Sequence, residues 1–105
     1  MAKKPETRFR EGTYRDLNSL PNTSWESIQQ VCIKGTPDIL MCINGYFVAL
    51  EYKKDIKTEP EPIQVYKHKK ITEAHGKTFI VHPRNWQEVF KELQNMANRN
   101  FFTLD

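Results

Sequence analysis

Two acids and a lysine stand in a stretch that is otherwise apolar and rich in β-branched residues, "KGTPDILMCINGYFVALEYKK" at residues 34–54. In its middle, Asn44-Gly45 is typical of a type I′ hairpin turn, which needs a positive φ at both central positions. With these two residues in the turn, antiparallel pairing places Asp38 directly opposite Glu51. Their Cβ atoms would then be about 4.5–5.5 Å apart. We therefore predict that the two carboxyl groups share one face of a hairpin.

The closeness of these carboxyl groups predicts a bound cation. Two carboxylates at such a distance repel each other, and the pKa of one rises unless a cation lies between them. Carboxylate oxygens without a soft ligand nearby suit Mg²⁺ or Mn²⁺ rather than zinc. Lys53 falls on the same face, two residues after Glu51, where it could act on an attacking water or hold a phosphate oxygen. The three residues are suited to the hydrolysis of a phosphodiester bond.

A plainer interpretation treats Asp38 as a turn residue, and Glu51 and Lys53 as solvated charges on an edge hairpin. The remaining residues of the face favour the metal site, because a solvated face would not be apolar. The period of two places four apolar residues there: Leu40, Cys42, Phe47 and Ala49.

The spacing of apolar residues predicts the elements that would hold this hairpin. Besides its two strands, we expect a helix over 3–20, a strand over 25–33, a helix from about Pro62 to His75, a strand over 77–82 and a helix over 85–97. Asn85 and Glu88 are spaced as a capping pair at the start of the last helix. This order predicts an α/β fold with helices packed on a mixed sheet, in a single domain over 1–105.

The composition is that of a globular chain with a mild positive charge. Hydrophobic residues make up 38% and charged residues 28%, and the net charge of +3 is compatible with a polyanionic partner. No apolar run approaches the roughly 20 residues of a membrane span, and the start "MAKKPETRF" lacks the apolar stretch of a signal peptide. We therefore expect no membrane association and a cytoplasmic location, that of the host cell if the chain is phage-encoded.

The cysteines and histidines do not predict a metal site of their own. Cys32 and Cys42 lack CxxC spacing, and we expect both to be small buried apolar residues. His68, His75 and His82 recur every seven residues. A glycine between the second and third interrupts the helix, so the three cannot share one helix face.

Pro37-Asp38 followed by Glu51-Tyr52-Lys53 resembles the PD-(D/E)xK motif of the restriction-endonuclease-like nuclease superfamily. Within it, the chain is similar to the VRR-NUC branch, whose small stand-alone members are often phage-encoded. That branch shows an early "PE.RF" helix, then "G.PD", a hairpin, "E.K" and a helix bearing a glutamine. The matching residues here are 5–9, 35–38, 51–53 and Gln64. The resemblance runs from about residue 5 to residue 90 and implies a restriction-endonuclease-like core with the active site on the Asn44-Gly45 hairpin.

The resemblance also implies roles for individual residues. Asp38 and Glu51 would ligate Mg²⁺ or Mn²⁺, with the Tyr52 carbonyl as a further ligand. Lys53 would act on the nucleophilic water.

Two more roles follow from the resemblance, each with a simpler alternative. Glu6 would reach the metal from the first helix, although the helix dipole alone explains an acid in a first turn. Gln64 would support the site or contact the substrate backbone, and it equally fits a solvated helix residue.

Basic residues near these positions predict contacts with a nucleic acid. Residues 67–70, "KHKK", form a positive cluster that would either follow phosphates or be a solvated helix face. We expect phosphate contacts from four lysines: Lys34, Lys54, Lys67 and Lys70.

The implied function is that of a metal-dependent DNA endonuclease. Stand-alone relatives of this size look like structure-specific nucleases that act as homodimers, with Holliday junctions as the leading substrate. A two-fold dimer would place two sites on two strands of matching geometry. The alternatives are a site-specific, homing-type or nicking endonuclease, a non-catalytic module that binds branched nucleic acid, and a protein-interaction domain in which the motif is incidental.

Overall fold

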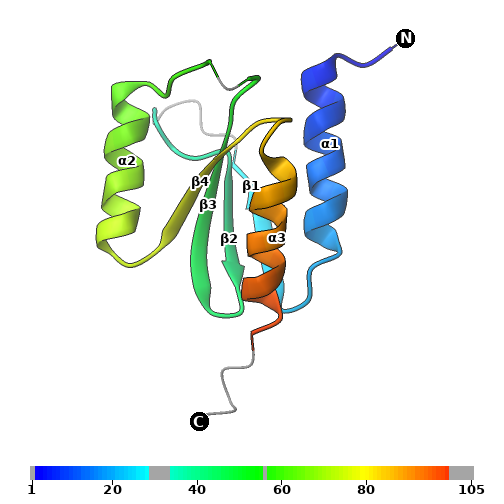
Figure 1. Ribbon diagram of the computed structural model, residues 1–105. Helices are drawn as coiled ribbons and strands as arrows, with labels where there is room; N and C mark the ends of the chain where they lie inside the picture. Colours follow the sequence, from blue (N-terminus) through cyan, green and yellow to red (C-terminus); the bar gives the residue numbers. More distant parts are fainter. Residues whose placement is uncertain (1, 29–33, 56, 100–105) are drawn as a thin grey trace.

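The computed structural model describes residues 2–28, 34–55 and 57–99. Their elements are, in chain order, α1 (Pro5–Asn18), β1 (Thr23–Ser27), β2 (Ile39–Ile43), β3 (Tyr46–Tyr52), α2 (Pro62–Glu73), β4 (Lys77–Val81) and α3 (Trp86–Ala97). The strands form a sheet in the order β1-β2-β3-β4 (Figure 1). The first three are antiparallel neighbours, whereas β4 runs parallel to β3 through the α2 crossover. The predicted mixed α/β sheet with flanking helices is confirmed.

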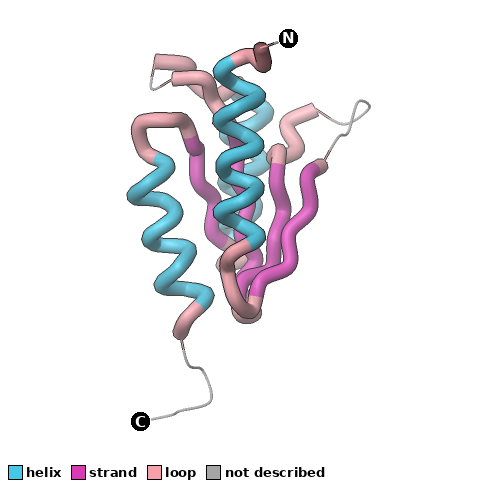
Figure 2. The backbone as a smooth tube through the Cα atoms, turned by 90° about the vertical axis from the view of Figure 1, so that its right-hand side faces the viewer, coloured by secondary structure: helices cyan, strands magenta, loops and turns pink. Residues whose placement is uncertain are grey.

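The hydrophobic core lies between the sheet and the two helices α1 and α3. Both helices lie on the same side of the sheet, as Figures 1 and 2 show. Leu17 of α1, Ile39 and Leu50 of the sheet and Leu93 of α3 are fully buried in this core. The helix α2 covers the opposite side and contributes no buried residue. Within the described ranges, no helix has both the length and the hydropathy that a transmembrane span requires.

The hairpin forms in the predicted register. Asn44 and Gly45 have φ angles of 50° and 91°, as a type I′ turn requires. Ile43 pairs with Tyr46 and Ile39 with Leu50, so the next position along the hairpin brings Asp38 to the level of Glu51. The local turn signal was therefore enough to set which side chains share a face.

Two local predictions differ from the structure. The strand expected over 25–33 is β1, which begins at Thr23 and ends at Ser27, and residues 29–33 lie outside the described residues. The capping pair is wrong, because the Asn85 side chain makes no capping bond to α3. Instead its Oδ1 accepts from the His82 N–H at 2.8 Å and its Nδ2 donates to the Ile80 oxygen at 2.7 Å. Asn85 is thus held by the end of β4, which it ties to the start of α3.

The expectation that Cys42 is buried is also wrong. Cys42 is exposed, as is its cross-strand neighbour Phe47. The reason is that α2 packs against β4, at the other edge of the sheet from β1, and leaves the outer side of β2 uncovered. Cys32 lies outside the described residues.

A buried hydroxyl pair joins α1 to the end of β3. The Thr13 and Tyr52 hydroxyl oxygens are 2.6 Å apart, and Thr13 also donates to the Arg10 carbonyl at 2.7 Å. Burial raises the pKa of Tyr52 to about 12, so its hydroxyl stays protonated. Because the Thr13 hydroxyl donates to the Arg10 carbonyl, Tyr52 is the donor of the bond between the two hydroxyls. This chain of bonds holds the first helix against the strand that carries Glu51.

Replacing Thr13 with valine should lower the free energy of unfolding by about 1–3 kcal/mol, because the buried Tyr52 hydroxyl loses its partner. Urea denaturation followed by circular dichroism measures this change. The double variant Thr13→Val/Tyr52→Phe removes both polar groups and should recover part of the loss. A double variant that is no more stable than Thr13→Val would contradict the assigned bond.

Candidate active site

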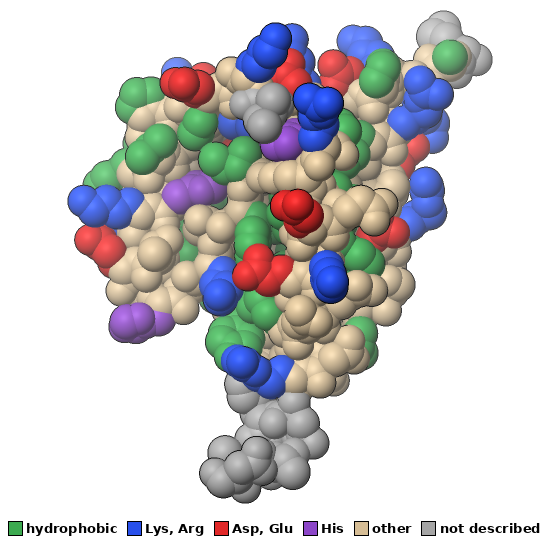
Figure 3. All heavy atoms as spheres, in the orientation of Figure 1, with side chains coloured by type: hydrophobic (Ala, Val, Ile, Leu, Met, Phe, Trp, Pro, Cys, Tyr) green, Lys and Arg blue, Asp and Glu red, His purple; other side chains and the backbone are tan. Residues whose placement is uncertain are grey.

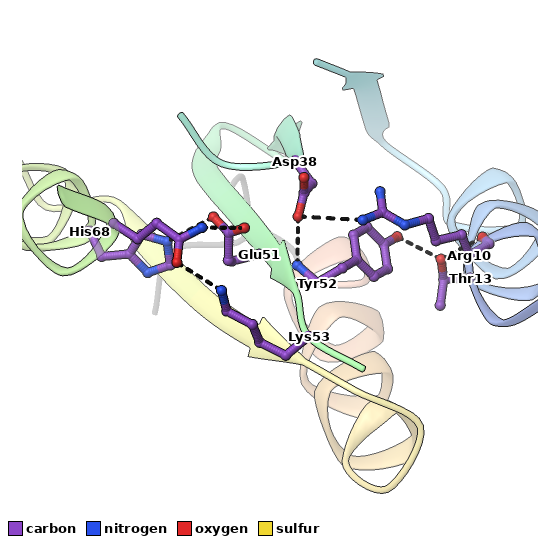
Figure 4. Close-up of polar contacts among 8 residues, drawn as sticks. Arg10, Thr13, Asp38, Glu51, Tyr52, Lys53 and His68 are labelled. Atoms are coloured by element: carbon purple, nitrogen blue, oxygen red, sulfur yellow. Dashed lines mark hydrogen bonds and ion pairs between the residues drawn. The ribbon is translucent and has the colours of Figure 1, made fainter. Parts of the chain in front are cut away.

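Asp38 lies just before β2, with its carboxylate directed at the end of β3. Its Oδ2 accepts a hydrogen bond from the Tyr52 backbone N–H at 2.8 Å, and its backbone oxygen accepts from the Ile28 N–H at 2.8 Å. The Arg10 Nη2 atom is 3.9 Å from the same Oδ2, and the Arg10 guanidinium lies 4.5 Å from the centre of the Tyr52 ring. These contacts hold Asp38 between β3 and α1 (Figure 4).

Gln64 connects Glu51 to Lys53. The Gln64 Nε2 atom donates to Glu51 Oε2 at 3.0 Å, and the Lys53 Nζ atom donates to Gln64 Oε1 at 2.7 Å. Gln64 Oε1 also accepts from the Glu61 backbone N–H at 3.0 Å, which fixes the amide at the start of α2. One side chain of α2 therefore sets the distance between the Glu51 carboxylate on β3 and Lys53, which follows the end of that strand.

The start of the helix α2 is set by Pro62. Pro62 occupies its first position, where the missing N–H costs no hydrogen bond, and Glu61 is the residue before it. Gln64 then falls in the first turn of the helix, where its side chain reaches back to the Glu61 N–H. The proline-rich segment that joins β3 to α2 thus aims Gln64 at Glu51.

Glu51 is a buried acid with an unusual environment. Its exposed fraction is 4%, although it is the penultimate residue of β3, close to the point where the chain leaves the sheet. Burial first, and the charge of nearby Asp38 second, raise the pKa of Glu51 to about 8, while Lys53 and Arg10 lower it in part. Additional positive charge beside such a carboxyl group would stabilise its anion.

The site contains two buried atoms whose hydrogen-bonding capacity is unused among the described residues. They are Glu51 Oε1 and His68 Nε2, which lie 3.8 Å apart. Buried polar atoms without a hydrogen-bond partner are rare in proteins, and binding of an ion is one recurring explanation for them.

The remaining predicted residues are spread around the site. Glu6 is exposed in the first turn of α1, where it lines a hollow of about 460 Å³ together with Arg10, Lys53 and Lys54. The Tyr52 side chain points toward α1, while its backbone lies beside Asp38.

The other predicted lysines differ in their distance from the site. Lys34 is exposed, shortly before Asp38 in the chain, and Lys67 is half-buried on α2. Lys70 lies in the last turn of α2, at the opposite end of the helix from Gln64 (Figure 1). Figure 3 shows Lys and Arg side chains, with acids among them, along the end of the molecule where β3 ends and α1 and α2 begin.

Two residues of the site, Arg10 and His68, were not among the predicted site residues. Arg10 follows Glu6 by one helical turn, and His68 follows Gln64 by one helical turn. The i, i+4 spacing on a helix face would have found both, because such residues project from one side of the helix.

The carboxylates of Asp38 and Glu51 fit a divalent cation, although no third acid, histidine or cysteine completes a metal-binding group with them among the described residues. Among the described residues, no three His, Cys, Asp or Glu side chains gather as a metal-binding group, so Glu6 does not join Asp38 and Glu51 in one. Two carboxylates are sufficient for Mg²⁺, which keeps several of its waters. Glu51 Oε1, which is buried and has no hydrogen-bond partner among the described residues, is an oxygen that could ligate such a cation.

The comparison with known proteins concerns the fold. No protein-family model and no curated protein matches the sequence. A solved structure described as "VRR_NUC domain" is similar to this one with a TM-score of 0.67 and 21% sequence identity, over 94% of this chain and 100% of that chain. The chain has the fold of that domain. The restriction-endonuclease-like α/β core expected from the sequence is thereby confirmed.

Proposed function

We propose that the protein is a Mg²⁺- or Mn²⁺-dependent endonuclease that hydrolyses phosphodiester bonds in branched DNA, with four-way junctions as its substrate. The observation that carries the proposal is the hydrogen-bonded series Glu51–Gln64–Lys53 beside Asp38. A buried carboxylate, a second carboxylate and a lysine held at a fixed distance are the groups that metal-assisted hydrolysis needs. The VRR_NUC fold supports the same class of reaction by analogy.

Each residue has a role that follows from its contacts. Asp38 and Glu51 would hold the cation, and the Tyr52 N–H keeps Asp38 oriented through Oδ2. When bound, the cation would supply positive charge that offsets the charge developing on the phosphate in the transition state.

Lys53 would orient the attacking water or neutralise a phosphate oxygen. Its half-buried ammonium group lies beside the hollow that Glu6 and Arg10 line, so a substrate phosphate can reach it. Gln64 acts as a positioning residue, since it holds Lys53 and Glu51 in one arrangement.

The choice of four-way junctions rests on the way in which two copies would act together. A two-fold dimer presents two sites in matching orientation, which suits symmetric nicks on two strands of a junction. We therefore propose a homodimer as the active form.

Cleavage of a synthetic four-way junction, compared with a linear duplex of the same sequence, tests this function. We expect symmetric nicks near the crossover with Mg²⁺ or Mn²⁺, and none in EDTA. Equal cutting of both substrates would retain the nuclease and exclude the junction preference. Tight binding without cutting in either metal would instead support the non-catalytic module.

Arg10 is expected to contact a phosphate of the substrate. Replacing it with methionine should reduce by about one the slope of log K against log salt concentration for DNA binding, since one fewer counterion is released. Arg15→Met is the matched control, because Arg15 is exposed in the last turn of the same helix. Fluorescence anisotropy over a salt series measures both slopes, and an equal change in the two variants would count against this role of Arg10.

A further inference from the structure

His68 faces Glu51 from the helix α2, one turn after Gln64 (Figure 4). Its Nε2 atom is 3.8 Å from Glu51 Oε1, and the two side chains are 13% and 5% exposed. Neither atom has a hydrogen-bond partner among the described residues. A nitrogen and an oxygen that both lack partners therefore face each other across a short gap inside the protein.

The width of this gap favours a metal ion between the two atoms. A hydrogen bond between nitrogen and oxygen is about 2.7–3.2 Å long, so the two atoms are too far apart to form one. Zn²⁺ lies about 2.0–2.2 Å from an imidazole nitrogen or a carboxylate oxygen, so a cation of similar size would form a bent bridge between two atoms at the observed separation. The surroundings also suit ligation: Gln64 occupies the other oxygen of Glu51 and holds the Lys53 ammonium group on its own Oε1.

We propose that His68 Nε2 and Glu51 Oε1 bind the same divalent cation, and that this nitrogen ligand makes the site prefer Mn²⁺ and the later first-row ions to Mg²⁺. The inference rests on the metal site of the proposed function and assigns it two direct protein ligands, Glu51 Oε1 and His68 Nε2, with Asp38 reaching the cation through one of its bound waters. Imidazole is a ligand for transition metals, whereas Mg²⁺ is bound almost entirely through oxygen.

Electron spin echo spectroscopy of Mn²⁺ bound to the full chain tests the ligand directly. We expect ¹⁴N modulation from a bound imidazole in the wild-type protein, and its loss in His68→Gln. Labelling the wild type with ¹⁵N-histidine should replace the ¹⁴N pattern, which tests histidine ligation without any substitution. The matched control is His75→Asn, since His75 is exposed with a φ of 70°, a conformation that asparagine tolerates.

Calorimetric titration with Mn²⁺ and with Mg²⁺ supplies the second measurement. Loss of a residue that only supports a metal ligand lowers metal affinity about 10- to 100-fold. Because His68 is proposed as a direct ligand, His68→Gln should weaken Mn²⁺ binding by at least this factor and Mg²⁺ binding much less. Mn²⁺ binding without nitrogen modulation in the wild type would overturn this inference and leave the proposed function standing. An absence of Mn²⁺ and Mg²⁺ binding altogether would overturn the proposed function itself.

Discussion

Replacing Lys53 with methionine should reduce the rate constant for cleavage of a four-way junction by about 10²–10⁴-fold at saturating Mg²⁺, the range expected for loss of a group that acts on the attacking water. Methionine keeps the length of the side chain and removes its charge. The variant should stay folded, because Lys53 is half-buried, and Gln64, which accepts from its ammonium group, also accepts from the Glu61 N–H. Single-turnover kinetics with excess enzyme separates this chemical step from substrate binding.

The neighbouring lysine supplies the control. Lys54 is exposed and lines the same hollow as Lys53. Lys54→Met should therefore weaken DNA binding slightly and leave the single-turnover rate nearly unchanged. Equal losses of rate in the two variants would mean that Lys53 contributes only its charge to substrate binding.

Replacing Glu51 with glutamine should abolish metal-dependent cleavage and yet stabilise the metal-free protein at alkaline pH. The pKa of Glu51 is raised from 4.5 to about 8, so between these values the folded chain holds a proton that the unfolded chain has lost. Stability of the wild type therefore falls as pH rises through this window. Glutamine does not titrate, and its amide can still accept from Gln64 Nε2.

Thermal denaturation in EDTA from pH 5 to pH 9 measures this difference. Each tenfold change in proton affinity is worth about 1.4 kcal/mol, so we expect Glu51→Gln to exceed the wild type by about 1–4 kcal/mol at pH 9 and the difference to shrink steadily toward pH 5. Glu26→Gln, which alters an exposed acid on β1, should show no such pH dependence. Parallel curves for wild type and Glu51→Gln would contradict the raised pKa.

Addition of metal should stabilise the wild type and not Glu51→Gln. A ligand at 100 times its Kd stabilises the folded state by about 2.7 kcal/mol, and the wild type should gain this amount with Mn²⁺. Glu51→Gln should gain little, because it lacks the carboxylate that we assign to the cation. A full gain in this variant would remove Glu51 from the metal site.

Much of the fold was accessible from neighbouring residues in the chain. Asn44 and Gly45 accept the positive φ angles of a type I′ turn, and this local property sets the register that brings Asp38 to the level of Glu51. The apolar stripe of α3 likewise follows from a helical period that any short window of sequence contains. Such signals are predictable because they depend on backbone geometry and on burial of one face.

Local sequence patterns gave wrong predictions in two situations. In one, a side chain had two possible hydrogen-bond partners; in the other, the packing of a helix elsewhere in the chain decided whether a residue is buried. Asn85 has the spacing of a helix cap, but the oxygen and the nitrogen of its side-chain amide both bond to backbone groups at the end of β4. Cys42 has the pattern of a buried strand residue, but α2 packs toward β4 and leaves it exposed. Competition of this kind is settled only by the packed structure.

The sequence by itself determined the hairpin and its register, which brings Asp38 to the level of Glu51. The tertiary structure alone decided that Gln64 and His68 of α2 reach Glu51. The reason is physical: a turn and a strand period are properties of adjacent residues, whereas the approach of a helix to a strand depends on how the crossover connection packs against the sheet.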